Sequence, residues 1–513
     1  MGKQRTRIMR IDFRKNWHRF AGSAFVGLFL LLLFFRLGYF EEKAAEIPLE
    51  NAPPVHAGAE SWLVISQEGR KIGYAHRRFL PTATGYHLTE DVLMHINTMG
   101  VVQALSFKTE GELDARMNLR SFNFYLDSSL FRFIAHGFVR DRLLTLHLGQ
   151  PGEEKKLEIP IKGALHLAAG ILETSRFKGL LPGESRTYYV FDPATLSERP
   201  VRIALAGREV RIVLKGKIRH ARKLSLDFMG ATQFAWIGED GTVLREKGIL
   251  GITLEQSTRE EALSGRRDMG SADLTELASL PANKTITSPG TLQELKVRLG
   301  NLGEGKFTMD GGRQTWQRGI LTIRKEGVPI SGRGKALPLK DRDALKPGPL
   351  IQSDDPQIVA KTIEIVAAGD SDIIKARKLV NWAYNNIKKR PVLSVPNALE
   401  TLQNMVGDCN EHAVLLAALA RAAGIPAEME AGLVYLRGRF YYHAWNALYL
   451  KNGWVTADAV LGQFPADVTH IRLVRGAAEK QMDLLGLIGR LKLEIIDFSP
   501  SAPAEPVAKG QIR

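Results

Sequence analysis

The clearest local signal in this chain is the run GDCNEHAVLLAALARAAGIP, which spans residues 407–426 and holds the only cysteine, Cys409. Its apolar residues recur with the spacing of one face of a helix. Asp408 is a good N-cap, Glu411 completes a capping box, and Gly424 ends the helix. Cys409 is therefore predicted at or near the first helical position. Free backbone N–H groups and the helix dipole favour a thiolate there, and the same N–H groups can stabilise an oxyanion.

Two predicted strands downstream carry what a nucleophilic thiol needs, a base and a group that orients the base. Residues 439–450 read RFYYHAWNALYL and form one strand, and residues 454–460 form the next after a hairpin turn at Asn452. A turn of even length puts His443 and Asp458 on the same face as near-diagonal neighbours. An imidazole and a carboxylate in these positions can meet.

The residues around Cys409, His443 and Asp458 resemble the transglutaminase-like, papain-like fold superfamily over about residues 350–475. The resemblance implies an α+β core in which helices precede the nucleophile and an antiparallel sheet follows it. It also implies a Cys-His-Asp triad that performs acyl transfer on amides. In that triad Cys409 is the nucleophile, His443 the base and Asp458 the orienting acid. The expected substrate is a peptide or protein amide, and no cofactor or metal is expected.

The neighbours of the predicted triad are assigned supporting roles. Tyr442 and Trp445 flank His443 and are expected to form the wall of the site or to bind substrate, and Trp445 is placed to shield the thiol and imidazole from water. His412 follows Cys409 on the same helix and is interpreted as a structural residue or a secondary contact.

Composition narrows the class of protein. A chain of 513 residues is too long for one ordinary domain. The net charge of +15 is compatible with an acidic partner, but the basic residues are scattered outside the N-terminus. A solvated surface is the better interpretation, and no nucleic acid partner is predicted. One cysteine excludes an intramolecular disulfide and a cysteine-rich zinc site. The oligomeric state stays open.

The N-terminus predicts a membrane anchor. A basic tail at 1–19 precedes an apolar segment at 20–40, which is long enough to span a bilayer, and a proline-containing linker follows at 41–60. The positive flank predicts a single-pass protein of the bacterial inner membrane, with a cytoplasmic tail and its main part in the periplasm. A cleaved signal peptide is the rival interpretation.

The rest of the chain is divided by its periodicity. Alternating apolar residues predict a large antiparallel β domain at 61–270 and a small β module at 271–349. The catalytic domain is predicted at 350–498, with further sheet at 463–476 and a last strand at 491–496, and a disordered tail follows at 499–513.

Three functions remain open on this sequence. An enzyme whose acyl group passes to water is a protease or amidase, and one whose acyl group passes to an amine is a cross-linking transglutaminase. The membrane-anchored setting favours hydrolysis. A binding protein that keeps the fold without catalysis is the alternative. A redox thiol is disfavoured because no second cysteine resolves it.

Overall fold

The computed structural model describes residues 59–128, 131–149, 154–172, 180–192, 196–228, 230–265, 272–303, 307–328, 338–451, 453–476 and 478–500. The chain divides into two units, Met1–Glu46 and Ile47–Arg513, and every described residue belongs to the second. The predicted tail at 1–19, the membrane segment at 20–40, the linker up to residue 58 and the tail from 501 lie outside the described residues and stay predictions. No helix in the described part is long and apolar enough to cross a membrane.

The predicted α+β class with a large antiparallel sheet is confirmed. One sheet runs in the order β8-β7-β6-β5-β4-β3-β2-β1-β15-β14-β13-β12-β11-β10-β9, with every strand pair antiparallel except β9 with β10. Its first eight strands are β1 Ala59–Gln67, β2 Arg70–Thr82, β3 Gly85–Thr98, β4 Val101–Asp114, β5 Leu119–Ser128, β6 Arg132–Arg140, β7 Leu143–Leu148 and β8 Lys155–Pro160. The other seven are β9 Leu165–His166, β10 Ser185–Asp192, β11 Ser197–Leu214, β12 Lys217–Phe228, β13 Ala231–Gly238, β14 Val243–Lys247 and β15 Ile252–Ser257.

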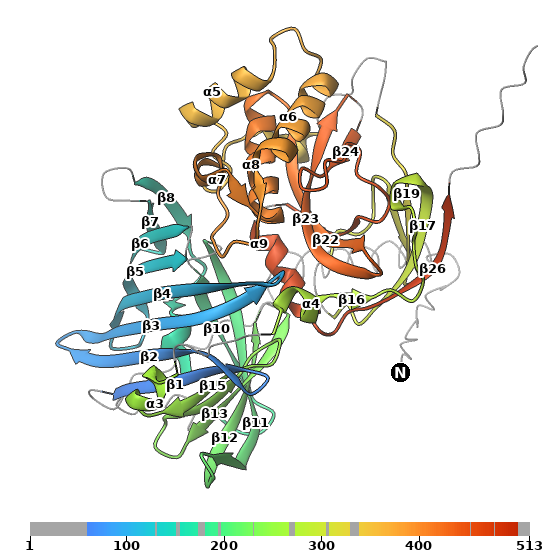
Figure 1. Ribbon diagram of the computed structural model, residues 1–513. Helices are drawn as coiled ribbons and strands as arrows, with labels where there is room; N and C mark the ends of the chain where they lie inside the picture. The colour runs from blue at the N-terminus through green and yellow to red at the C-terminus, as the bar shows by residue number, and fades with distance from the viewer. Residues whose placement is uncertain are drawn as a thin grey trace, which may run out of the picture. The chain divides into compact units, whose positions relative to one another are not determined.

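This sheet curls back on itself around the short helix α2 (Ala168–Leu172). The ring centroids of Phe122 in β5 and Phe191 in β10 lie 5.1 Å apart, although the two strands are far apart in the strand order. Four residues of α2 are buried against this interior. The curled sheet (Figure 1) encloses apolar clusters built mainly from residues of its own strands and of α2.

The C-terminal part packs helices against a second sheet. The helices are α5 Pro356–Ile365, α6 Asp372–Asn386, α7 Ala398–Asn404 and α8 Cys409–Ala422. The sheet has the order β16-β23-β22-β25, with β24 paired to β23, and its strands are β16 Leu280–Pro281, β22 Ala427–Leu436, β23 Arg439–Leu450, β24 Gly453–Ala457 and β25 Ile471–Arg475. Every residue of α8 from 411 to 420 is buried, because helices cover one side of it and β22 and β23 the other (Figure 1).

The predicted division between a β module at 271–349 and a catalytic domain at 350–498 differs from the structure. The strands β17 Leu292–Gly300, β18 Gln314–Gln317 and β19 Ile320–Arg324 are completed by β26 (Lys492–Pro500), which pairs with β17 and not with the second sheet. Val297 and Ile323 of this four-stranded sheet belong to the same apolar core as Leu415 of α8. Because it shares this core and its fourth strand, the module is part of the C-terminal fold.

Smaller elements complete the described chain. They are the helices α3 Arg259–Leu263, α4 Leu274–Ala278 and α9 Ala478–Gln481, the 3₁₀ segments η3 Pro289–Thr291, η4 Leu339–Leu345 and η5 Met482–Leu487, and the short parallel pair β20 Lys388–Lys389 and β21 Val406–Gly407.

A glycine allows β25 to approach β22. A Cβ at Gly432 would collide with the backbone carbonyl of Ile471. Gly432→Ala should therefore lower the free energy of unfolding by about 1–3 kcal/mol, as overpacking does elsewhere, in a urea titration of the full-length protein. Gly453→Ala is the matched control, because no heavy atom lies within 4 Å of its Cβ position. Equal stability of the two variants would contradict this account.

Candidate functional site

Cys409 occupies the first position of α8, and a reciprocal cap fixes that helix start. The Oδ1 atom of Asp408 accepts the N–H of Asn410 at 2.9 Å, and Glu411 Oε2 accepts the N–H of Asp408 at 3.0 Å. Ser394 donates its hydroxyl to Glu411 Oε1 at 2.5 Å. Burial and the neighbouring Asp408 raise the pKa of Glu411 well above its usual range. The cap thus fixes the helix start at which Cys409 lies.

The thiol of Cys409 is protonated at rest, which corrects the sequence-based expectation of a depressed pKa. Burial and the charge of Asp408 raise the pKa of Cys409 well above its usual range. The backbone N–H of Ala444 donates to the sulfur and opposes this shift without reversing it. The start of a helix favours a thiolate, but here desolvation outweighs that effect. Attack by this sulfur therefore requires a base.

His443 directly precedes Ala444 on β23. It is therefore adjacent in sequence to the residue whose N–H contacts the sulfur of Cys409. The pairing of Asn446 with Ala457 in β23 and β24 places Asp458 directly past the end of β24, on the same side of the sheet as His443. The Nε2 atom of His443 lies 2.7 Å from Asp458 Oδ2. This hydrogen bond leaves Nδ1 as the ring nitrogen that can take a proton from a thiol.

Asp458 is ionised and held in place on both oxygens. Its Oδ1 atom accepts the backbone N–H groups of Val460 at 2.7 Å and Leu461 at 3.0 Å. Burial alone would raise the pKa of Asp458, but His443 and then His470 outweigh it and hold the pKa well below its usual range. The side chain is fully buried, so its negative charge acts on the two imidazoles with little screening.

Sequence reasoning missed His470. Its Nε2 atom lies 2.9 Å from Asp458 Oδ2, the oxygen that His443 also contacts, and its Nδ1 atom lies 3.4 Å from Asp467 Oδ1. The segment 463–476 was predicted as sheet, but β25 begins only at Ile471, and the residues before it form a loop. The spacing of Asp467 and His470 was the one available signal, and it is too common to indicate a site.

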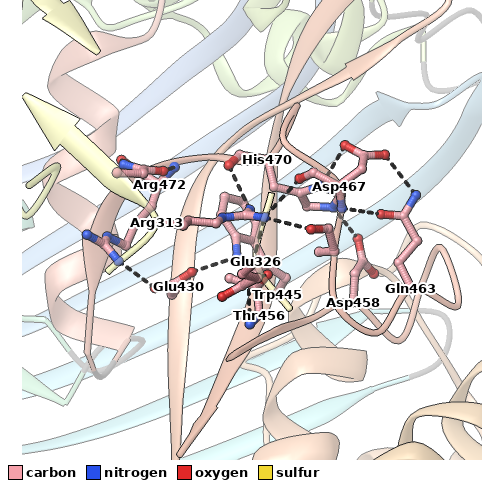
Figure 2. Close-up of polar contacts among 12 residues, drawn as sticks. Arg313, Glu326, Glu430, Trp445, Thr456, Asp458, Gln463, Asp467, His470 and Arg472 are labelled. Carbon is pink, nitrogen blue, oxygen red and sulfur yellow. Dashed lines mark hydrogen bonds and ion pairs between the residues drawn. The ribbon is translucent and has the colours of Figure 1, made fainter. Parts of the chain in front are cut away.

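The four-stranded sheet supplies the side chain that fixes this loop. Arg313 donates to the carbonyl oxygens of Ala466 at 2.6 Å and His470 at 3.0 Å. Glu326 lies 3.6 Å from Arg313 and accepts the N–H of Thr456 at 2.8 Å, which ties the same cluster to β24. Figure 2 shows this network around His470 and Asp458.

Trp445 packs beside the two imidazoles from within the core. It is 1% exposed, and its indole N–H donates to Glu430 Oε2 at 2.8 Å. Its ring stacks on His443 at a centroid distance of 6.0 Å and meets His470 edge-on at 5.2 Å.

Glu430, which accepts the indole N–H of Trp445, is itself held by two arginines. Arg472 and Arg475 donate to Glu430 Oε1 at 3.1 Å and 2.8 Å. Burial alone would raise the pKa of Glu430, but Arg475 and Arg472 lower it to about 2. The carboxylate therefore stays ionised at neutral pH and can accept the indole N–H (Figure 2).

Tyr442 and His412 lie in different surroundings from each other. Tyr442 is half-buried on the opposite side of β23 from His443 and packs against the apolar core, and burial raises its pKa. His412 is buried, its Nδ1 atom lies 2.6 Å from the Asp408 carbonyl oxygen, and burial lowers its pKa. The structure thus places His412 at the helix start as a neutral side chain, and Tyr442 in the body of the domain.

The ligand atoms of His443, Asp458 and His470 lie within 4.8 Å of one another, the kind of cluster that can hold a metal ion. Both ring Nε2 atoms are, however, already at hydrogen-bond distance from the same carboxylate oxygen. The arrangement therefore fits proton sharing between a carboxylate and two imidazoles.

Comparison with known proteins gives one family. A model of the transglutaminase-like superfamily matches residues 360–459, which confirms the resemblance predicted from the sequence. No curated protein sequence matches this chain.

Among solved structures, a candidate cysteine protease from Cytophaga hutchinsonii is 15% identical with a TM-score of 0.26, over 41% of this chain and 89% of that chain. The periplasmic domain of TgpA from Pseudomonas aeruginosa bound to ethylmercury is 14% identical with a TM-score of 0.26, over 41% of this chain and 96% of that chain. A β-barrel-like protein from Brucella abortus is 9% identical with a TM-score of 0.31, over 40% and 97%. These TM-scores are too low to carry an argument, so the assignment rests on the family match.

The raised pKa of Cys409 predicts its reactivity. Alkylation by iodoacetamide, followed by mass spectrometry from about pH 6 to about pH 10, should show a midpoint above the ~8.5 of a free thiol, with N-acetylcysteine as reference. Asp408→Asn keeps a capping side chain and removes the second cause of the shift, so its midpoint should be lower. A wild-type midpoint below about pH 7 would show a resting thiolate and overturn this description.

Proposed function

Because residues 360–459 form a transglutaminase-like domain, we propose that the protein is a cysteine acyl-transfer enzyme that acts on peptide or side-chain amides. The observation that carries the proposal is the hydrogen bond of 2.7 Å from His443 Nε2 to the ionised Asp458, next to the Cys409 contact with Ala444. It supplies a nucleophile, a base and a group that holds the base in one tautomer, which is the minimal set for nucleophilic catalysis.

In the first step the Sγ atom of Cys409 attacks the amide carbonyl carbon while its proton passes to Nδ1 of His443. A tetrahedral intermediate forms, and its negative oxygen can accept the backbone N–H of Cys409, because Asp408 already accepts those of Asn410 and Glu411. The C–N bond then breaks, and the imidazolium of His443 returns its proton to the leaving nitrogen. Asp458 stays ionised throughout and stabilises the imidazolium. The product is a thioester on Cys409 and a free amine or ammonia.

In the second step water or an amine attacks the thioester, with His443 again accepting the proton. The C–S bond breaks, and the imidazolium returns the proton to the sulfur of Cys409. Water gives net hydrolysis, and an amine gives a new amide. The protonated resting thiol means that His443 acts as a general base at the moment of attack. We favour hydrolysis because of the predicted anchor at 20–40, which places the domain at the inner membrane on the periplasmic side.

Loss of turnover in the triad variants tests this function. The full-length protein is incubated with casein, which offers both peptide bonds and glutamine side chains, with and without a dansylated primary amine. New amino termini report proteolysis, ammonia reports deamidation or transfer, and dansyl incorporation reports transfer alone. Cys409→Ala and His443→Ala should lower every rate by roughly 10³-fold or more.

The control is His220→Ala, which removes an exposed histidine of β12 and should leave the rates unchanged. If wild type and Cys409→Ala are equally inactive in all three assays, and if ligand binding is also equal, the protein is a binding protein that keeps the fold.

A further inference from the structure

We propose that His470 is a positioning residue of the Cys409–His443–Asp458 site: as an imidazolium between Asp458 and Asp467, it shares one oxygen of Asp458 with His443 and thereby sets the basicity of His443. The inference rests on the proposed function for its catalytic meaning, although the charge arrangement itself does not depend on turnover. It adds a fourth ionisable group, from a different part of the chain, to the triad.

The hydrogen-bond geometry requires both imidazoles to be donors toward one acceptor. Asp458 Oδ2 lies 2.7 Å from His443 Nε2 and 2.9 Å from His470 Nε2. An ionised carboxylate only accepts, so each Nε2 atom must carry a hydrogen. Asp458 Oδ1 is already occupied by two backbone N–H groups, so the carboxylate cannot rotate away from either ring without breaking bonds on both oxygens.

The second nitrogen of His470 shows where its charge lies. Its Nδ1 atom is buried and lies 3.4 Å from the Oδ1 atom of Asp467. An unprotonated lone pair facing a carboxylate oxygen would be repelled, whereas a protonated Nδ1 is attracted to it. Burial alone would lower the pKa of His470, but Asp458 and then Asp467 outweigh it and raise the pKa above its usual value. Both observations indicate an imidazolium.

Within the described part of the chain, the other charged groups near this pair are already paired or more distant. Arg313 donates to the carbonyl oxygen of His470, and Glu326 balances that guanidinium at 3.6 Å. Lys389 lies within electrostatic range of Asp458 and His412, and its amine donates to the carbonyl oxygen of Tyr384. None of these groups contacts Asp458 Oδ2, so His443 and His470 divide its charge between them.

This division has a direct consequence for the base. A carboxylate that served His443 alone would raise the pKa of its imidazole strongly. A second imidazolium on the same oxygen withdraws part of that effect and adds the repulsion of a like charge, with the two rings 6.0 Å apart. Nδ1 of His443 remains the ring nitrogen that can accept the proton of Cys409. Arg313 fixes the distance, because it holds the backbone of the loop that carries His470.

Histidine side-chain NMR tests this arrangement without any substrate. Full-length protein labelled with ¹⁵N-histidine is titrated from about pH 5 to about pH 9, and the ring nitrogens report protonation and tautomer of each residue. In wild type, His470 should remain doubly protonated through neutral pH, and neutral His443 should carry its hydrogen on Nε2. His470→Gln keeps an N–H donor for Asp458 and removes the charge, so the pKa of His443 should rise by roughly one unit.

His166→Gln is the matched control, because it replaces a buried histidine in β9 of the large sheet and should leave His443 unchanged. A role in packing alone would lower the melting temperature of His470→Gln without moving the pKa of His443. An unchanged His443 pKa in folded His470→Gln overturns the inference. A wild-type His470 that is neutral at pH 7 also overturns it, even if the variant fails to fold.

The two proposals fail separately in this design. If the pKa of His443 shifts in His470→Gln but the wild-type protein turns over no amide, the proposed function is contradicted and the charge arrangement is supported. If amide turnover depends on Cys409 but the pKa of His443 is unchanged in His470→Gln, the proposed function is supported and the role of His470 is contradicted.

Discussion

The carboxylate of Asp458 is the constraint on which the rest of the site depends. It accepts the N–H groups of Val460 and Leu461 on one oxygen and the rings of His443 and His470 on the other. A buried charge with fewer partners would cost several kcal/mol and would be neutralised by protonation. The two imidazoles therefore keep Asp458 ionised, and Asp458 in turn fixes both rings.

The rest of the C-terminal fold holds this group in place from three directions. The helix α8, buried from residue 411 to 420, presents Cys409 at its capped start. Glu430 holds Trp445 beneath both rings from β22. The four-stranded sheet, which looked like a separate module, contributes Arg313 and Glu326 to the loop before β25. This sheet is completed by β26, so strands from the two ends of the C-terminal fold meet behind the site.

The sequence predicts those parts of the site that depend on neighbours in the chain. The capped start of α8 and the meeting of His443 with Asp458 follow from local spacing and from one hairpin turn. His470 could not be found in this way, because its place depends on Arg313, which lies 157 residues earlier in the chain. The pairing of β26 with β17 is non-local in the same sense. The raised pKa of Cys409 was missed because burial is a property of the packed fold and not of the helix start.

The central claim is that a thioester forms on Cys409 with His443 as its base. The most direct measurement is acid-quenched mass spectrometry of the full-length protein after brief exposure to a mixture of glutamine-containing peptides. The account predicts an acyl adduct on Cys409 that hydroxylamine removes, and that is absent in His443→Ala. Amide turnover with no adduct on Cys409, or an adduct that forms equally without His443, would contradict it.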